Sequence, residues 1–149
     1  MPLHHCQLME NVENNAKMQR LLAEGKQVRL TPVGNSMLPF IRGEVDSVVL
    51  QKPESLRVGD IALAPYHGRY VLHRIICIDG NTVVMMGDGI VKAKEKVDRT
   101  TVLATVNEIV KADGRRCKPT RGYLWRLLLP VRRYLLKGMR KWNKLLGKQ

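Results

Sequence analysis

The sequence predicts a mainly β protein with one helix before its strands and a basic, amphipathic helical tail after them. Two observations support this fold class. Between residues 28 and 112, short runs rich in Val, Ile, Leu and Tyr alternate with turn-forming residues, as in strands joined by hairpins. On both sides of this stretch, apolar residues recur at every third or fourth position, which is typical of one face of a helix. The 149 residues are enough for one domain with a single core.

The N-terminal segment, residues 1–27, is expected to hold one helix. The apolar positions with helical spacing are Leu8, Met9, Val12, Ala16, Met18, Leu21 and Leu22. Gly25 is the expected end of the helix, because glycine accepts the left-handed backbone with which helices often stop.

Residues 28–112 are expected to form a meandering, mostly antiparallel sheet. Its strands are predicted at 28–33, 46–51, 60–65, 69–78, 82–87 and 101–110. Two of the intervening stretches, Tyr66-His67-Gly68 and Asp79-Gly80-Asn81, are rich in turn formers and predict hairpins.

The C-terminal segment, residues 113–149, is expected to be helical and amphipathic. Pro130 should begin a new helix or kink an existing one. The apolar stripe consists of Leu124, Leu128, Val131, Leu135, Met139, Trp142 and Leu146. A separate basic face consists of Arg126, Arg133, Lys137, Arg140 and Lys144.

The net charge of +13 is concentrated in this tail. Residues 111–149 hold 13 of the 26 Lys and Arg residues and a single acidic residue, Asp113. A basic tail attracts phosphate-bearing partners, which are nucleic acid or an anionic membrane surface. The apolar stripe with two tryptophans favours the membrane surface as the partner of residues 121–146, with packing of the stripe on the sheet as the alternative.

Composition also bounds the cellular location. The three cysteines are widely spaced and predict neither a disulfide framework nor a zinc site. The polar N-terminus lacks the apolar core of a secretory signal, and no stretch approaches the ~20 apolar residues that span a bilayer. The expected location is therefore the cytoplasm, with peripheral attachment to the inner face of the membrane left open.

Three short motifs carry candidate chemistry. Ser36 lies in Gly34-Asn35-Ser36-Met37-Leu38-Pro39, a predicted turn that would expose its hydroxyl. His73 interrupts an apolar strand, and a histidine with an ordinary pKa of ~6.5 suits the activation of a serine. Asp88, between two glycines at a strand end, could orient that imidazole. Taken singly, each motif also fits a structural role: a turn serine, a half-exposed strand histidine and a turn-capping aspartate.

The order of the motifs is more specific than any one of them. The sequence contains, in succession, Gly34-x-Ser36-Met37-x-Pro39, Val58-Gly59-Asp60-Ile61-Ala62, His73-Arg74-Ile75 and Gly87-Asp88. This series resembles the signature boxes of the signal peptidase I superfamily, which also includes self-cleaving SOS-type repressors. The resemblance covers roughly residues 30 to 110 and implies a coiled antiparallel sheet of the signal-peptidase type.

The resemblance also implies roles for residues. Ser36 takes the place of the nucleophile and His73 that of the general base. Bacterial signal peptidases and SOS repressors have lysine at the base position, whereas archaeal and endoplasmic-reticulum enzymes have histidine, so this chain is similar to the histidine-base variant. In those enzymes an aspartate in or shortly after the Gly-Asp box assists, and Asp88 matches the box.

Two positions depart from the family pattern. Many members have serine two residues before the nucleophile as an oxyanion donor, whereas this chain has Gly34, which leaves the Ser36 N–H and Asn35 for that task. The aspartate expected a few residues after the box is also missing. Glu95 could substitute for it, so the third catalytic residue stays open between Asp88 and Glu95.

The resemblance implies a serine endopeptidase that binds an extended peptide or leader and cleaves it near small side chains. No cofactor or metal is expected. A self-cleaving repressor is disfavoured, because no helix-turn-helix precedes Ser36 and no Ala-Gly or Cys-Gly cleavage pair is present there. The alternative from another class is a non-enzymatic adaptor with the same fold that binds membrane or, less favoured, nucleic acid through its tail. The sequence predicts neither the substrate nor the oligomeric state.

Overall fold

The computed structural model describes residues 4–7, 12–90, 93–122 and 132–147 and confirms a mainly β fold with a helix near each end. The helices are α1 (Val12–Ala23) and α3 (Arg132–Leu145). The strands are β1 (His4–Gln7), β2 (Val28–Thr31), β3 (Ser47–Gln51), β4 (Ile61–Tyr66), β5 (Arg69–Asp79), β6 (Thr82–Met86), β7 (Glu95–Asp98), β8 (Ala104–Val110) and β9 (Arg116–Cys117).

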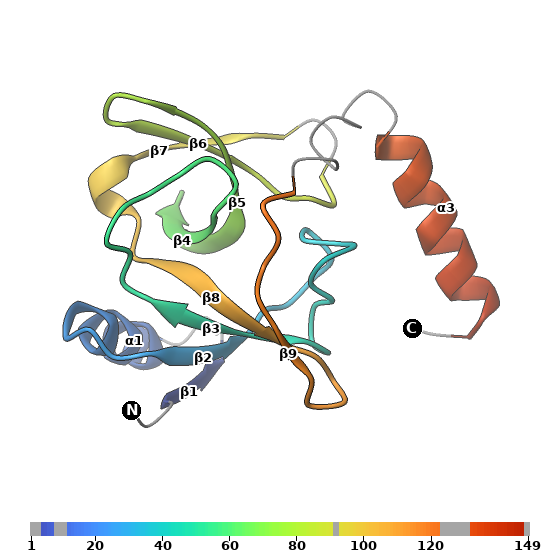
Figure 1. The fold of residues 1–149 in the computed structure, drawn as a ribbon, viewed down its shortest axis with the longest axis horizontal. Helices are drawn as coiled ribbons and strands as arrows, with labels where there is room; N and C mark the ends of the chain where they lie inside the picture. Colours follow the sequence, from blue (N-terminus) through green and yellow to red (C-terminus); the bar gives the residue numbers. More distant parts are fainter. Residues whose placement is uncertain (1–3, 8–11, 91–92, 123–131, 148–149) are drawn as a thin grey trace.

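These strands form one sheet in the order β1-β2-β3-β8-β4-β5-β6-β7, with β9 paired to β8. Each pair is antiparallel except β1 with β2, which is parallel. In Figure 1 the sheet curls, so that β5, β6 and β7 lie above the layer of β2, β3 and β8, and α1 lies beside β2 and β3.

The two predicted hairpins are present. Tyr66 pairs with Arg69 across the turn of His67 and Gly68, and both turn residues have positive φ, as a two-residue hairpin loop requires. Asp79 pairs with Thr82 across a turn in which Gly80 also has positive φ.

The apolar core consists of two clusters. The larger one covers the layer of β2, β3 and β8 and includes the buried face of α1, which supplies Met18, Leu21 and Leu22. The smaller one fills the curl between β4, β5, β6 and β7 and centres on Ile75, Val83 and Met85. Each large side chain buried in this way contributes about 1.5–3 kcal/mol. The clusters fix the position of β5, which carries His73.

Three strands were not predicted, namely β1, β7 and β9. In β7 the burial alternates, with Glu95 and Val97 inside and Lys96 and Asp98 outside. Its sequence, Glu-Lys-Val-Asp, has only one apolar residue, because one of its two inward positions holds the carboxylate of Glu95. The strand therefore lacks the apolar alternation by which strands are predicted. The strand predicted from residue 101 begins only at Ala104, since residues 99–101 form a 3₁₀ turn capped by the Asp98 carboxylate.

The chain after β8 is fastened to the sheet before the tail begins. β9 pairs with β8, the Thr120 carbonyl accepts a hydrogen bond from Arg74, and Arg121 forms an ion pair with Asp60 at 2.6 Å. Pro130 and the apolar positions 124, 128 and 131 lie outside the described residues.

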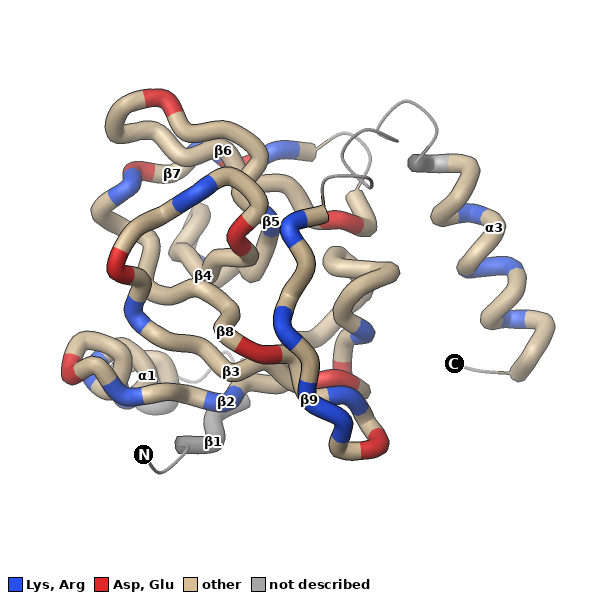
Figure 2. The backbone as a smooth tube through the Cα atoms, in the orientation of Figure 1, with Lys and Arg blue, Asp and Glu red and all other residues tan. Residues whose placement is uncertain are grey.

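α3 itself carries Lys and Arg side chains without an acidic one, in contrast to the mixed charges of the body (Figure 2). Within the described ranges, no helix is both long enough and apolar enough to cross a bilayer.

Candidate active site

The predicted site residues Ser36 and His73 line one pocket of about 830 Å³. The pocket lies between the loop that joins β2 to β3, the first half of β5, and the residues around β7. Glu95 lines it as well, together with apolar side chains that include Val33, Met37 and Ile90. A loop and the strands β5 and β7, which β6 separates in the sheet, thus bring three residues that are far apart in sequence to one cavity.

Ser36 lies on a loop shaped by short-range hydrogen bonds and by Gly34, which has a φ of 82°. The Leu38 N–H donates to the Asn35 carbonyl at 3.3 Å, and Ile41 N–H to the Met37 carbonyl at 3.0 Å. The hydroxyl and the N–H of Ser36 are not hydrogen-bonded to any described residue. Both groups are therefore free to act on a bound molecule.

The Gly87-Asp88-Gly89 loop packs directly on the loop of Ser36. Gly89 N–H donates to the Ser36 carbonyl at 2.8 Å. A Cβ atom at Gly87 would lie 2.4 Å from the Ser36 carbonyl oxygen, and one at Gly89 would lie 2.4 Å from that of Asn35. Because no side chain fits at such distances, the two glycines allow the close approach that fixes the backbone of Ser36.

His73 is buried on β5, opposite Ala62 of β4. Its Nδ1 atom contacts the Oε1 atom of Glu95, and this pair is nearly closed off from solvent. Its Nε2 atom lies toward Gly87, 3.1 Å from where a Cβ of that residue would stand. The Nδ1 side of the ring thus faces Glu95, and Nε2 faces the side where the Ser36 loop packs. A neutral imidazole protonated on Nδ1 would present the lone pair of Nε2 to that loop.

Ser36 and His73 share the cavity without a hydrogen bond between their side chains. Catalytic hydrogen bonds are often long in unliganded sites and tighten when substrate binds. The structure therefore places the two residues in one cavity without pairing their side chains.

Asp88 is placed differently from the role assigned to it in the sequence. Its carboxylate pairs with the Arg74 guanidinium, with Nε–Oδ1 at 2.9 Å and Nη2–Oδ2 at 2.7 Å. The carboxylate that contacts His73 is Glu95. Of the two acids left open as the third residue, the geometry sets Glu95 against the imidazole and Asp88 behind the loop of Ser36.

Arg74 is fully buried and has acceptors on several segments. Besides Asp88, it donates to the carbonyls of Gly59 and Thr120 and lies over the ring of Phe40. A buried charge is tolerated only when its donors are satisfied, and here they are satisfied by separate parts of the chain. This residue thus holds the Gly-Asp box, the start of β4 and the C-terminal segment together.

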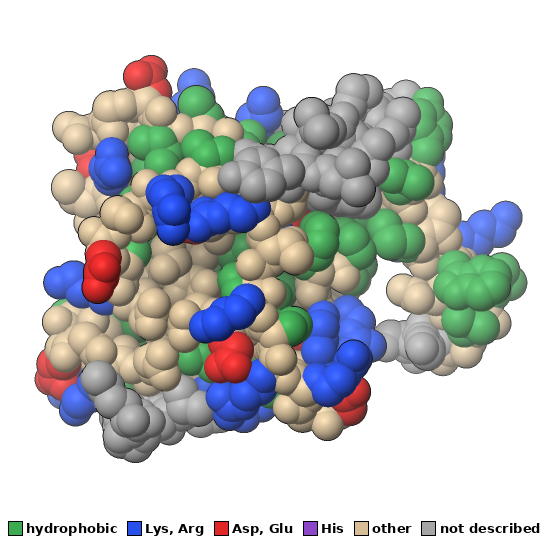
Figure 3. All heavy atoms as spheres, in the orientation of Figure 1, with side chains coloured by type: hydrophobic (Ala, Val, Ile, Leu, Met, Phe, Trp, Pro, Cys, Tyr) green, Lys and Arg blue, Asp and Glu red, His purple; other side chains and the backbone are tan. Residues whose placement is uncertain are grey.

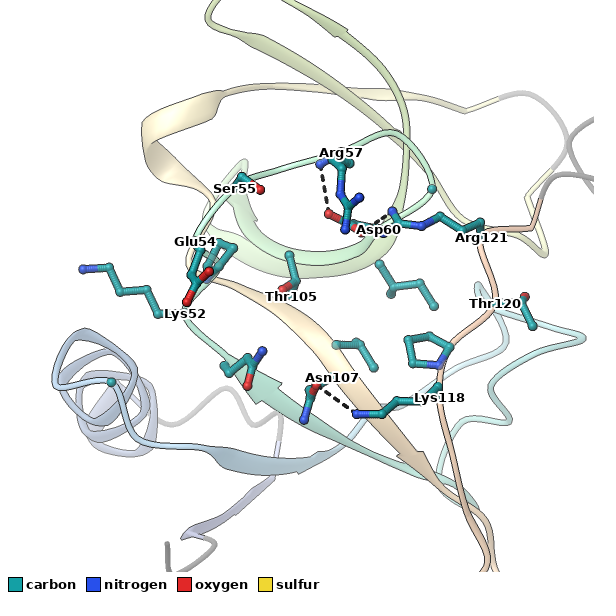
Figure 4. A pocket seen from close by; sticks show the side chains of 17 residues that line it. Lys52, Glu54, Ser55, Arg57, Asp60, Thr105, Asn107, Lys118, Thr120 and Arg121 are labelled. Carbon is teal, nitrogen blue, oxygen red and sulfur yellow. Dashed lines mark hydrogen bonds and ion pairs between the residues drawn. The ribbon is translucent and has the colours of Figure 1, made fainter.

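A second hollow of about 470 Å³ lies on another part of the surface, between the β3–β4 loop, β8 and residues 118–121 (Figure 4). Three of its charged side chains contact neighbours, with Arg121 paired to Asp60 and Lys118 bonded to Asn107. None of the candidate catalytic residues lines it, so the chemistry is assigned to the pocket of Ser36.

Comparison with family models and with curated proteins gave no match for this chain.

Proposed function

We propose that this protein is a serine endopeptidase in which Ser36 is the nucleophile, His73 the general base and Glu95 the group that orients the base. The observation that carries the proposal is the buried pair of His73 and Glu95 opening on the same pocket as an unengaged serine hydroxyl. A serine needs a neighbouring base to attack a carbonyl, and the base in turn needs a fixed tautomer.

The reaction would proceed in two stages. In the first, Ser36 Oγ attacks the scissile carbonyl carbon while its proton passes to Nε2 of His73, and the peptide C–N bond then breaks as His73 returns this proton to the leaving amine. In the second, His73 takes a proton from water, the hydroxide attacks the ester carbonyl, and the proton returns to Ser36 as the acid product leaves. Glu95 stabilises the imidazolium formed in each stage.

The Ser36 N–H supports the stabilisation of the oxyanion, because it has no other partner among the described residues. The N–H shares its peptide plane with the Asn35 carbonyl, which accepts the Leu38 N–H, and the next peptide is held by the bond from Gly89 N–H to the Ser36 carbonyl. One lost oxyanion donor typically costs 10²–10³ in rate, so a rigid backbone here has a large effect.

The substrate would be an extended segment of peptide or protein with small or apolar side chains. The pocket walls beside Ser36 are formed by Val33, Met37 and Ile41, which favour such side chains over charged ones.

Peptide mass spectrometry of cells that produce the parent chain or Ser36→Ala tests the proposal. We expect one processing event that disappears with Ser36→Ala and persists with Ser55→Ala, because Ser55 is an exposed serine in the other hollow. If processing is unchanged by Ser36→Ala, the non-enzymatic adaptor becomes the better interpretation.

A further inference from the structure

α3 exposes a continuous apolar stripe. Trp142 is 63% exposed, Leu146 52% and Leu135 42%, and Met139 lies between them at helical spacing. Leu145 and Tyr134 extend the stripe on one side and are also exposed. In the described part of the tail, Leu135, Trp142 and Leu146 therefore do not pack on the sheet, which was the alternative left open by the sequence.

The helix touches the body through a different side. Leu136 is buried, and the Arg140 guanidinium donates to the Gly89 carbonyl at 3.4 Å. These two residues are four positions apart and so share one side of the helix, away from the stripe of Leu135, Trp142 and Leu146. Figure 3 shows the helix projecting beside the body with open space next to its C-terminal half and apolar atoms on its surface.

The remaining face of α3 is basic. It carries Lys137, Lys141 and Lys144, all exposed, and the residues from 132 to 147 include no acid. A helix with an apolar face that contains tryptophan and a polar face of Lys and Arg has the composition of helices that lie in the headgroup region of a bilayer.

We propose that α3 docks this protein on an anionic membrane surface, with the stripe of Leu135, Met139, Trp142 and Leu146 inserted between lipids and the basic face next to the phosphates. The charge selects the partner, since an anionic surface complements a helix without acids. Nucleic acid would use the basic face alone and would leave the apolar stripe in water, so it fits the two faces less well.

The test is cosedimentation of the full chain with vesicles of phosphatidylcholine alone or mixed with phosphatidylglycerol. We expect binding to the mixed vesicles only, and loss of that binding at high salt. Lys141→Gln and Lys144→Gln should each weaken binding roughly fivefold, whereas the matched change Lys17→Gln on α1 should have no effect.

The apolar contribution is tested by the double change Trp142→Glu and Leu146→Glu, which should abolish binding. Val45→Glu is the control, because Val45 is an exposed apolar residue outside α3. Ser36→Ala should bind like the parent chain, so a failure of the peptidase proposal does not affect this result.

Three results would overturn the docking proposal: no sedimentation with anionic vesicles, sedimentation that is unchanged by every α3 substitution, or binding of α3 to an RNA or DNA oligomer in place of vesicles. If the double glutamate variant loses its helix by circular dichroism, the two Lys variants still decide the question, since exposed Lys to Gln changes preserve helix propensity.

Discussion

At the level of residues, two acids hold two neighbouring basic residues of β5. Glu95 contacts His73, and Asp88 pairs with Arg74. Consecutive residues of a strand point to opposite faces of the sheet, so the two carboxylates contact the imidazole and the guanidinium on different faces. This alternation explains how one strand can place a candidate base in the pocket and a buried structural cation behind it.

Substitutions of the two acids should therefore have different effects on kcat and on the free energy of unfolding. Glu95→Gln keeps the shape of the side chain, but its amide can donate to Nδ1 and put the proton of His73 on Nε2, where the lone pair is needed. We expect kcat to fall roughly 10²–10⁴-fold with little change in the free energy of unfolding. The substrate for the assay is the peptide whose processing depends on Ser36.

Asp88→Asn is the matched comparison. It removes the charge that pairs with fully buried Arg74, so the free energy of unfolding should fall by about 3 kcal/mol or more. At a temperature where both variants are folded, kcat should change less than it does with Glu95→Gln. Equal losses of kcat, with Asp88→Asn as stable as the parent, would instead make Asp88 the orienting residue.

At the level of elements, how far the sequence could predict the structure depends on what stabilises each strand. β5 and its two hairpins were predicted because their apolar content and turn residues are local signals. β7 was not predicted, because its inward positions hold Glu95 and a single valine. That the carboxylate of Glu95 is buried follows only from its contact with His73, which the sequence does not indicate.

The same reason explains the ambiguity about the third residue of the site. Ser36 and His73 were proposed from short motifs, whereas the choice between Asp88 and Glu95 depends on β7 lying beside β6. The order of the strands in the sheet depends on the packing of the whole chain and has no local signal in the sequence.

The loop of Ser36 is anchored at its far end by a buried acid. Asp46 accepts hydrogen bonds from the Arg42 N–H at 2.8 Å, from the Arg42 guanidinium and from Lys111 of the segment after β8. Lys111 also donates to the Phe40 carbonyl at 2.8 Å. Burial alone would raise the pKa of Asp46, but these donors outweigh it and hold the pKa below its ordinary value.

This lowered pKa predicts how stability depends on pH. A carboxyl with a lower pKa in the folded state stabilises the fold above its unfolded pKa of ~3.9 and loses that contribution as pH falls through the folded value. Asp46→Asn should cost roughly 2–3 kcal/mol at neutral pH, and the difference from the parent chain should shrink in acid below about pH 4. Urea unfolding of both chains across this pH range measures the difference in their free energies of unfolding. A difference that is the same at every pH would contradict the prediction.

At the level of the whole molecule, the curl of the sheet brings the Gly-Asp-Gly loop between the loop of Ser36 and α3. Gly89 donates its N–H to the Ser36 carbonyl and accepts from Arg140 of α3 through its own carbonyl. A protein docked through α3 would therefore hold the proposed active site close to the bilayer, within reach of segments that emerge from it.

The body and the tail divide near Gly122. Arg74 donates to the Thr120 carbonyl, Arg121 pairs with Asp60, and buried Gly122 lies so close to Arg74 that a Cβ there would approach the guanidinium to 2.9 Å. Residues 116–122 therefore stabilise the sheet, although the sequence analysis included them in the helical segment expected from residue 113.

Two truncations test this division. A chain that ends at Gly122 keeps every contact of Arg74 named above and loses the burial of Leu136, so its free energy of unfolding should fall by no more than about 1.5–3 kcal/mol, and it should lose binding to anionic vesicles together with α3. A chain that ends at Lys118 also leaves a donor of buried Arg74 without its Thr120 acceptor and removes the partner of Asp60, which should cost about 2–4 kcal/mol more, close to the value for a broken buried pair. Urea denaturation of the three chains gives these differences. If both truncated chains prove equally stable, the segment from 119 to 122 is only a linker, and Arg74 draws its stability from Asp88 and Gly59.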